Sequence, residues 1–141
     1  MKKISSLLLL LIFALASCTK DDQDSPENIQ EKWVLIEMEG STPNSKTTGD
    51  DMEWQEFYLL NSDGTFKKSR ENNGLSKEIT GVYKVVDSAN QNILELSYII
   101  ESEIIGTCSS ELKEYMDFKS ETLFSSTWEQ CDGPGLKYEK L

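Results

Sequence analysis

The sequence predicts an all-β domain, an antiparallel up-and-down meander that closes into a small eight-stranded barrel. Three observations predict it. Short runs rich in β-branched and aromatic residues recur at regular intervals, glycine-containing turn pairs stand between several of them, and no segment of useful length has the 3.6-residue period of a helix. Periodicity alone leaves a two-sheet sandwich open as the alternative.

The strands are expected in chain order from residue 32. The first reads KWVLIEM, and a polar loop rich in Gly, Pro and Ser follows it over residues 39–51. Residues 104–108 add a short strand or extend a neighbouring one. Strands are expected over residues 32–38, 54–60, 65–70, 78–86, 93–100, 112–119, 122–130 and 136–140, with connectors at 87–92 and 132–135.

Two pairs predict tight hairpins between strands. Asp63-Gly64 and Asn73-Gly74 supply residues that adopt the positive φ these turns need. Side-chain alternation along the strands then places one apolar set on a common inner side. That set suits a packed or nearly packed lumen, and it comprises Phe57, Leu59, Phe66, Tyr83, Val85, Leu94, Leu96, Tyr98, Met116 and Phe118.

The N-terminal 17 residues have the pattern of a secretory signal peptide. Lys2 and Lys3 precede an apolar stretch over residues 4–16, which is shorter than the about 20 residues that span a bilayer. Leu15-Ala16-Ser17-Cys18 resembles the lipobox of bacterial lipoproteins, which implies that Cys18 is lipidated and begins the mature chain. Two or more lipid chains give a stable anchor. The alternative is cleavage nearby, with Cys18 an ordinary thiol.

The residues after Cys18 indicate a destination. Thr19 is not the aspartate that retains enteric lipoproteins at the inner membrane, so the outer membrane is expected. Lys20-Asp21-Asp22 resembles a tag that exports some Gram-negative lipoproteins to the cell surface. The alternative reading is a solvated acidic tether. Residues 18–31 are expected to form this tether, and residues 32–141 to form the barrel domain.

The mature chain is strongly acidic. Removal of residues 1–17 leaves 141 − 17 = 124 residues with a side-chain charge of (14 − 2) − 25 = −13, since two of the lysines lie in the signal peptide. That length suits one domain with a core of its own. An acidic surface repels phosphate backbones, so nucleic acid is not an expected partner. The lipid on Cys18 is the expected contact with the membrane.

Several short motifs together resemble the short lipocalin-like lipoproteins of Gram-negative bacteria. They are Lys32-Trp33-x-Leu35, Asp63-Gly64-Thr65-Phe66, Gly81-x-Tyr83-x-Val85 and Leu94-x-Leu96, which span nearly the whole mature chain. The resemblance implies a lipocalin-like barrel with Trp33 closing one end. Glu31 occupies the place where the lipocalin signature has glycine, so the resemblance does not imply that this chain transports a ligand.

Cys108 and Cys131 remain as an even pair once Cys18 is assigned to lipid. A secreted setting is oxidising, so a disulfide between them is expected, and it would contribute about 3 kcal/mol in the chain-entropy model. The alternative is a metal or redox pair. The chain has no C-x-x-C spacing and no histidine, and both absences count against a metal site or a redox pair.

The absence of histidine excludes Ser-His-Asp and Cys-His catalysis and any His-ligated zinc centre. Carboxylate pairs such as Glu53 with Glu56 remain open for glycoside hydrolysis, but abundant acids usually form a solvated surface. Residues 50–53 lack the spacing of an EF-hand calcium loop. We therefore expect no enzyme, no cofactor and no metal site.

Two classes of function fit these observations. One is a barrel that binds a small hydrophobic or amphipathic molecule at its mouth, and the other is a packed barrel whose loops bind an envelope protein or a glycan. The loop over residues 39–51 follows the first strand, where lipocalin-like barrels carry a lid. We therefore expect Trp54, Tyr58 and Tyr98 to lie toward that mouth as ligand-pocket residues, or else to cap the core.

Overall fold

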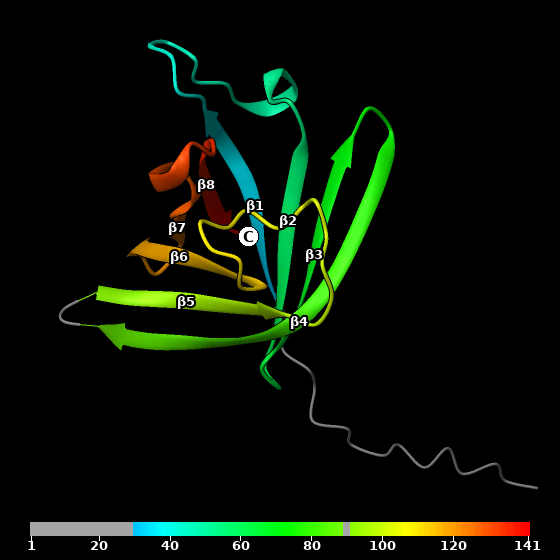
Figure 1. The fold of residues 1–141 in the computed structure, drawn as a ribbon, viewed down its shortest axis with the longest axis vertical. Helices are drawn as coiled ribbons and strands as arrows, with labels where there is room; N and C mark the ends of the chain where they lie inside the picture. Colours follow the sequence, from blue (N-terminus) through cyan, green and yellow to red (C-terminus); the bar gives the residue numbers. More distant parts are fainter. Residues whose placement is uncertain (1–29, 89–90) are drawn as a thin grey trace, which may run out of the picture.

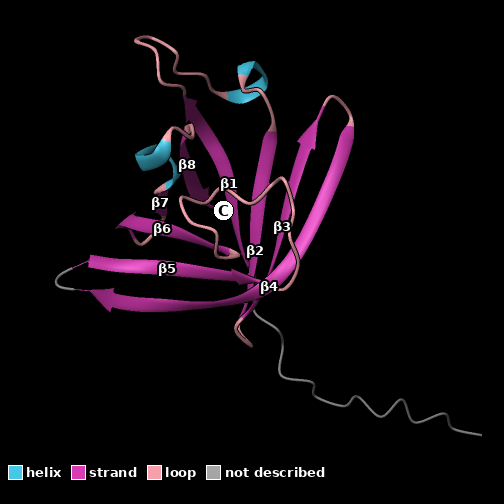
Figure 2. Ribbon diagram, in the orientation of Figure 1, coloured by secondary structure: helices cyan, strands magenta, loops and turns pink. Residues whose placement is uncertain are grey.

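The computed structural model describes residues 30–88 and 91–141 and shows a domain of eight antiparallel strands. Each strand pairs with the next, and the last pairs with the first, so the sheet closes into a barrel (Figures 1 and 2). The predicted meander is confirmed, and the sandwich alternative is wrong. The elements are β1 (Gln30–Glu39), η1 (Gly49–Asp51), β2 (Gln55–Asn61), β3 (Thr65–Asn72), β4 (Leu75–Ser88), β5 (Gln91–Tyr98), β6 (Lys113–Ser120), β7 (Leu123–Ser126), η2 (Trp128–Cys131) and β8 (Gly135–Lys140).

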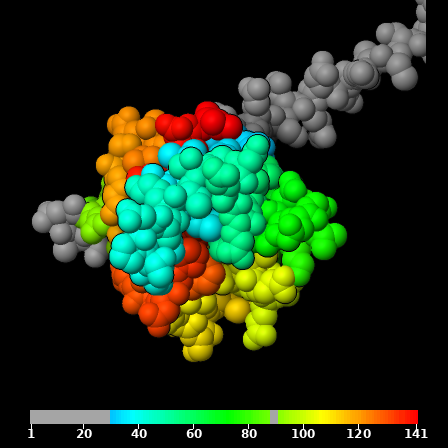
Figure 3. Space-filling model, turned by 90° about the horizontal axis from the view of Figure 1, so that it is seen from above, coloured from blue at the N-terminus to red at the C-terminus, as the bar shows by residue number. Residues whose placement is uncertain are grey.

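The predicted signal peptide, Cys18 and the Lys20-Asp21-Asp22 motif lie outside the described residues. β1 begins beside the β2–β3 turn, where the Gln30 side-chain amide donates to Asn61 Oδ1 at 2.9 Å. We call this end of the barrel the tether end. The opposite end carries the β1–β2 loop, the β3–β4 turn and η2, and Figure 3 looks onto it.

The two predicted hairpin turns lie where the sequence placed them. Gly64 adopts a φ of 84°, and the Asp63 carboxylate accepts a hydrogen bond from the Thr65 amide at 2.9 Å. Asn73 and Gly74 both have positive φ, at 52° and 77°. Two successive positive φ values match the twist of the flanking strands, so this turn holds β3 and β4 in register.

Gly81 lets β4 change partners. The first half of β4 pairs with β3 and the second half with β5, and the strand curves between them (Figure 1). A Cβ atom at Gly81 would overlap the Ser97 carbonyl oxygen and lie 2.7 Å from the Phe66 ring. Only glycine allows this close approach of backbone and ring, and the approach closes the sheet on itself.

A continuous chain of aromatic rings fills the barrel from the tether end inward. Trp33 stacks on Phe124 with ring centroids 4.4 Å apart, and it is 2 % exposed. Trp33 is therefore part of the core near the tether end, and its role as a plug remains what the resemblance implies. Contacts between successive rings, with centroids 4.4–6.4 Å apart, link Trp33, Phe124, Tyr138, Tyr58, Phe66 and Tyr98 in that order.

The predicted inner side is wrong for β2. Phe57 and Leu59 face outward, because Glu56, Tyr58 and Leu60 are the buried residues of this strand. Val85 is also misplaced, since it is 55 % exposed near the end of β4. The other predicted inner residues are buried or pack against the core: Phe66, Tyr83, Leu94, Leu96, Tyr98, Met116 and Phe118.

Three predicted boundaries also need correction. Residues 104–108 form no strand but part of an irregular loop. The strand predicted over residues 122–130 ends at Ser126, and η2 occupies the rest. β4 extends to Ser88 and β5 begins at Gln91, so most of the connector predicted at 87–92 is strand.

Candidate functional site

Charged side chains occupy the inner side of the barrel beyond the aromatic rings. Glu56 lies on β2, Lys68 and Arg70 on β3, and Glu114 on β6. The strand register places Glu56 opposite Arg70 and Tyr58 opposite Lys68. Alternation then directs all of them to the interior, where the Glu56, Lys68 and Glu114 side chains are at most 1 % exposed.

These four side chains form one charge-balanced cluster. Lys68 Nζ lies 2.6 Å from Glu114 Oε1 and 3.2 Å from Glu56 Oε1, and Arg70 Nε donates to Glu56 Oε2. Two carboxylates thus face two cations. Such a buried arrangement persists only when every charge is paired and hydrogen-bonded.

Three tyrosine hydroxyls complete the shell of the carboxylates. Tyr138 donates to Glu56 Oε1 at 2.6 Å, Tyr58 donates to Glu114 Oε2 at 2.7 Å, and Tyr98 donates to the same Glu114 oxygen. Burial raises the pKa of all three phenols well above the ordinary value of 10.0, and the facing carboxylates raise it further. These hydroxyls therefore remain protonated donors.

This shell predicts a loss of stability at alkaline pH. Above about pH 10 the unfolded chain releases phenolic protons that Tyr58, Tyr98 and Tyr138 keep in the fold, so the stability is fully present below that pH and falls as pH rises further. Phenolate absorbance during a pH titration should show these tyrosines ionising only as the protein unfolds. Ionisation of all five tyrosines near pH 10 in folded protein would contradict the buried shell.

A loop over residues 99–112, which we call the strap, covers the cluster. Its ends meet where the Tyr98 amide donates to Leu112 O at 2.8 Å, and in Figure 1 it crosses in front of β1 and β2. Its Ile104 side chain is buried, and Ile104 O accepts from Lys68 Nζ at 2.6 Å and from Arg70 Nη2 at 3.2 Å. The Gly106 amide donates to Glu114 Oε1. The strap thus contributes three hydrogen bonds to the cluster.

A disulfide fastens the strap to η2. Cys108 and Cys131 are bonded with their Cα atoms 5.5 Å apart, which confirms the predicted pair. Trp128 packs between the backbones of Gly106 and Gly133, where a Cβ at either glycine would overlap its ring. The strap is therefore held from the outside by one covalent bond and from the inside by Ile104.

A cleft of about 430 Å³ opens beside the strap, between it and the β3–β4 turn. The Arg70 guanidinium lies 4.2 Å from the centre of the Trp54 ring, a stacking that favours a cation. Burial lowers the pKa of Arg70, but the charge and hydrogen bond of Glu56 outweigh it and raise the pKa overall. The cleft is lined by Glu53, Trp54, Arg70, Asn72, Asn73, Leu75, Lys77, Glu103 and Ile104.

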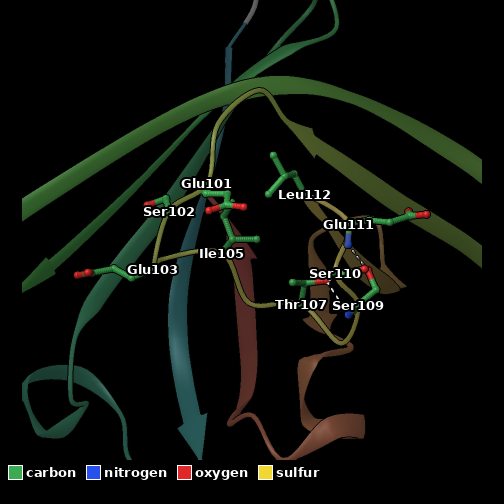
Figure 4. Close-up of a pocket in the computed structure, with 9 residues that line it drawn as sticks. All are labelled: Glu101, Ser102, Glu103, Ile105, Thr107, Ser109, Ser110, Glu111 and Leu112. Carbon is green, nitrogen blue, oxygen red and sulfur yellow. Dashed lines mark hydrogen bonds between the residues drawn. The ribbon is translucent and has the colours of Figure 1, made fainter.

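The strap also encloses a shallow hollow of its own, of about 450 Å³. In Figure 4 the Glu103 and Glu111 side chains point away from this hollow, and hydrogen bonds link Thr107, Ser109 and Glu111. Every residue that lines it belongs to residues 101–112. The hollow is thus the inner curve of one loop, and no other element contributes to it.

The three residues predicted for a ligand pocket lie in different parts of this site. Tyr58 and Tyr98 are brought together on one oxygen of Glu114 and line none of the clefts beside the strap. Trp54 lines the cleft and contacts the cluster through Arg70. The long β1–β2 loop covers the middle of the same end in Figure 3 and buries Met52 in the core, whereas the strap contacts the charge cluster.

Sequence reasoning missed Lys68, Arg70 and Glu114, and it considered Glu56 only as a possible carboxylate partner of Glu53. The sequence did hold a signal for two of these four residues. Glu56 alternates with the same face as Trp54 and Tyr58, and Lys68 lies on the same face of its strand as Phe66. Within residues 30–88 and 91–141, no group of three or more acidic or cysteine side chains is arranged to hold a metal ion.

Comparison with protein-family models, curated proteins and solved structures gives no match for this chain. Among the described residues, no helix has the length and apolar character needed to cross a membrane.

Proposed function

We propose that this chain is a non-catalytic lipoprotein, anchored through Cys18 in the outer membrane and displayed at the cell surface. We propose further that it binds a small amphipathic molecule in the cleft beside the strap. The filled lumen supports a site at an end of the barrel, since aromatic rings and the charge cluster occupy the interior.

The chemistry of the cleft carries the proposal. Arg70 engages Nε and Nη2, whereas its Nη1 group makes no hydrogen bond within the described residues. The Trp54 ring also lines the cleft, and its buried indole N–H, like that of Trp33, has no acceptor within the described residues. Leu75 offers apolar surface at the rim and is 73 % exposed. Donors beside apolar surface suit an amphipathic ligand whose polar group accepts hydrogen bonds.

The position of β1 suits an anchor at Cys18. β1 begins at the tether end, and the cleft lies at the opposite end beside the strap. A chain anchored through Cys18 would therefore hold its tether end toward the membrane and its cleft away from it.

Binding of the neutral naphthalene ketone PRODAN, whose emission reports its environment, tests the cleft. We expect saturable binding to the mature chain that weakens about tenfold in Leu75→Asp, because a carboxylate at the rim opposes an apolar ring. Val82→Asp is the matched control, since Val82 is 54 % exposed and lies outside the cleft. Absent binding, or equal weakening in both variants, would remove the cleft as a ligand site.

Lipidation is tested separately. Cys18→Ser is expected to leave an unprocessed precursor that no longer incorporates a palmitate analogue, because the hydroxyl cannot replace the thiol as lipid acceptor. Protease treatment of intact cells should remove the wild-type domain, and alanine at Lys20, Asp21 and Asp22 should protect it. Continued labelling of Cys18→Ser would contradict the anchor, and protection of the wild type would place the domain on the periplasmic face.

The filled lumen also favours a second candidate, a packed barrel that binds an envelope protein or a glycan through its loops. This candidate requires no small-molecule site. It is the function that remains if PRODAN and other amphipathic probes show no saturable binding.

A further inference from the structure

The strap contacts the charge cluster in the way that a bound ligand would. Ile104 belongs to no strand, yet its carbonyl oxygen receives hydrogen bonds from two buried cations, Lys68 and Arg70. Its side chain is buried against the same site and also lines the cleft. One polar acceptor and one apolar group thus enter the barrel together, which is the composition of a small amphipathic molecule.

The charges of the site restrict what can replace Ile104. Glu56 and Glu114 already balance Lys68 and Arg70, so a carboxylate placed at the Ile104 oxygen would leave one uncompensated negative charge in the interior. A neutral carbonyl accepts from both cations without disturbing that balance. The site therefore selects ketones, amides and esters over acids.

The outer fastening of the strap is accessible. Cys108 and Cys131 are both exposed. Besides this bond, the strap is held by the Ile104 and Gly106 contacts, the packing on Trp128, the core contacts of Ile105 and Leu112, and an exposed Lys77–Glu103 ion pair. Exposed ion pairs contribute little. A dithiol reductant would donate two electrons and two protons, the S–S bond would break, two thiols would form, and the donor would become a disulfide.

We infer that the Glu56–Lys68–Arg70–Glu114 cluster is a binding site for a neutral carbonyl-bearing amphiphile, that Ile104 of the strap is its resident occupant, and that reduction of Cys108–Cys131 admits the ligand. This inference rests on the proposed function, because it assigns the polar group of the same ligand. When a ligand binds only after the strap has moved away, its apparent affinity equals its intrinsic affinity multiplied by the fraction of molecules in the open state.

PRODAN binding to the mature chain before and after dithiothreitol treatment tests the inference. We expect binding to tighten at least tenfold on reduction, with emission shifted to the blue as the probe enters the interior. The alcohol obtained by reducing the ketone of PRODAN should gain much less, since it is the weaker acceptor. The anionic dye 8-anilinonaphthalene-1-sulfonate should gain little, because its charge is not compensated.

Strap variants give an independent reading in the oxidised protein. Ile104→Gly removes the buried side chain and should tighten PRODAN binding several-fold, whereas Ser110→Gly, at an exposed position of the strap, should not. Equal affinity in oxidised, reduced and Ile104→Gly protein would overturn the inference and make the strap a permanent plug. In that case PRODAN binding that weakens in Leu75→Asp would still support the cleft as a ligand site. The experiment therefore tests the two proposals independently.

Discussion

Lys68→Met is expected to destabilise the barrel by about 3–5 kcal/mol, the range for removing one partner of a buried ion pair. Lys68 is the cation shared by Glu56 and Glu114, and methionine would leave these carboxylates facing one another with only Arg70 to compensate them. Ile104 O would also lose its shorter hydrogen bond. Urea unfolding followed by tryptophan fluorescence measures the loss as a lower midpoint.

The adjacent lysine provides the control. Lys67 points outward and pairs with Glu78 at 2.9 Å, with both side chains substantially exposed. Exposed pairs of this kind contribute at most about 1 kcal/mol, so Lys67→Met should change stability little. Equal losses from the two variants would contradict the buried cluster.

Replacing both Cys108 and Cys131 with alanine is expected to lower the free energy of unfolding by about 3 kcal/mol, the chain-entropy estimate for residues 23 positions apart. The barrel should remain folded, because the disulfide joins the strap to η2 and neither element is a strand of the sheet. Thermal unfolding followed by circular dichroism measures the change. Far-ultraviolet spectra before heating show whether the sheet is intact.

Ser110→Ala is the matched substitution within the strap. Ser110 is exposed and lies two positions from Cys108, and a surface change of this kind usually stays within about 0.5 kcal/mol. A double alanine variant as stable as Ser110→Ala would show that the cross-link does not hold the strap.

The strands and hairpins were predictable because their determinants are local. Asp63-Gly64 and Asn73-Gly74 specify turns through the backbone conformations they permit, and the strands on either side follow. Boundaries at β7 and η2 were not predictable, since Trp128 leaves the sheet to pack between Gly106 and Gly133, and both glycines lie outside β7.

The inner face of β2 was assigned to the wrong side for a physical reason. Both faces of this strand carry apolar residues. The hydrophobic pattern favours the face without an acidic residue as the inner one, and that face contains Phe57 and Leu59. Glu56 lies on the buried face because Lys68 and Arg70 compensate its charge there and Tyr138 donates a hydrogen bond to it. These partners come from β3 and β8, so the compensation exists only in the folded barrel.

The candidate site was predictable only in part. The Cys108–Cys131 bond was predicted from the even number of cysteines left after Cys18 and from an expected oxidising compartment. Trp54, Tyr58 and Tyr98 all contact members of the cluster. The strap was not recognised, because Ile99 and Ile100 extended the strand predicted over residues 93–100 and residues 104–108 were predicted to add another short strand. Its position depends on contacts with the cluster and η2 rather than on its own sequence.

The pairing of β1 with β8 makes barrel closure a late event in folding. Lys137 on β8 contacts Glu37 on β1 across 100 positions of sequence, and a topology built on such distant contacts folds slowly. Synthesis proceeds from the N-terminus, so one edge of β1 has no partner until the last six-residue strand has emerged. An open strand edge invites pairing with other molecules. A chain that ends before Gly135 would therefore be prone to aggregate, even though most of its core residues are present.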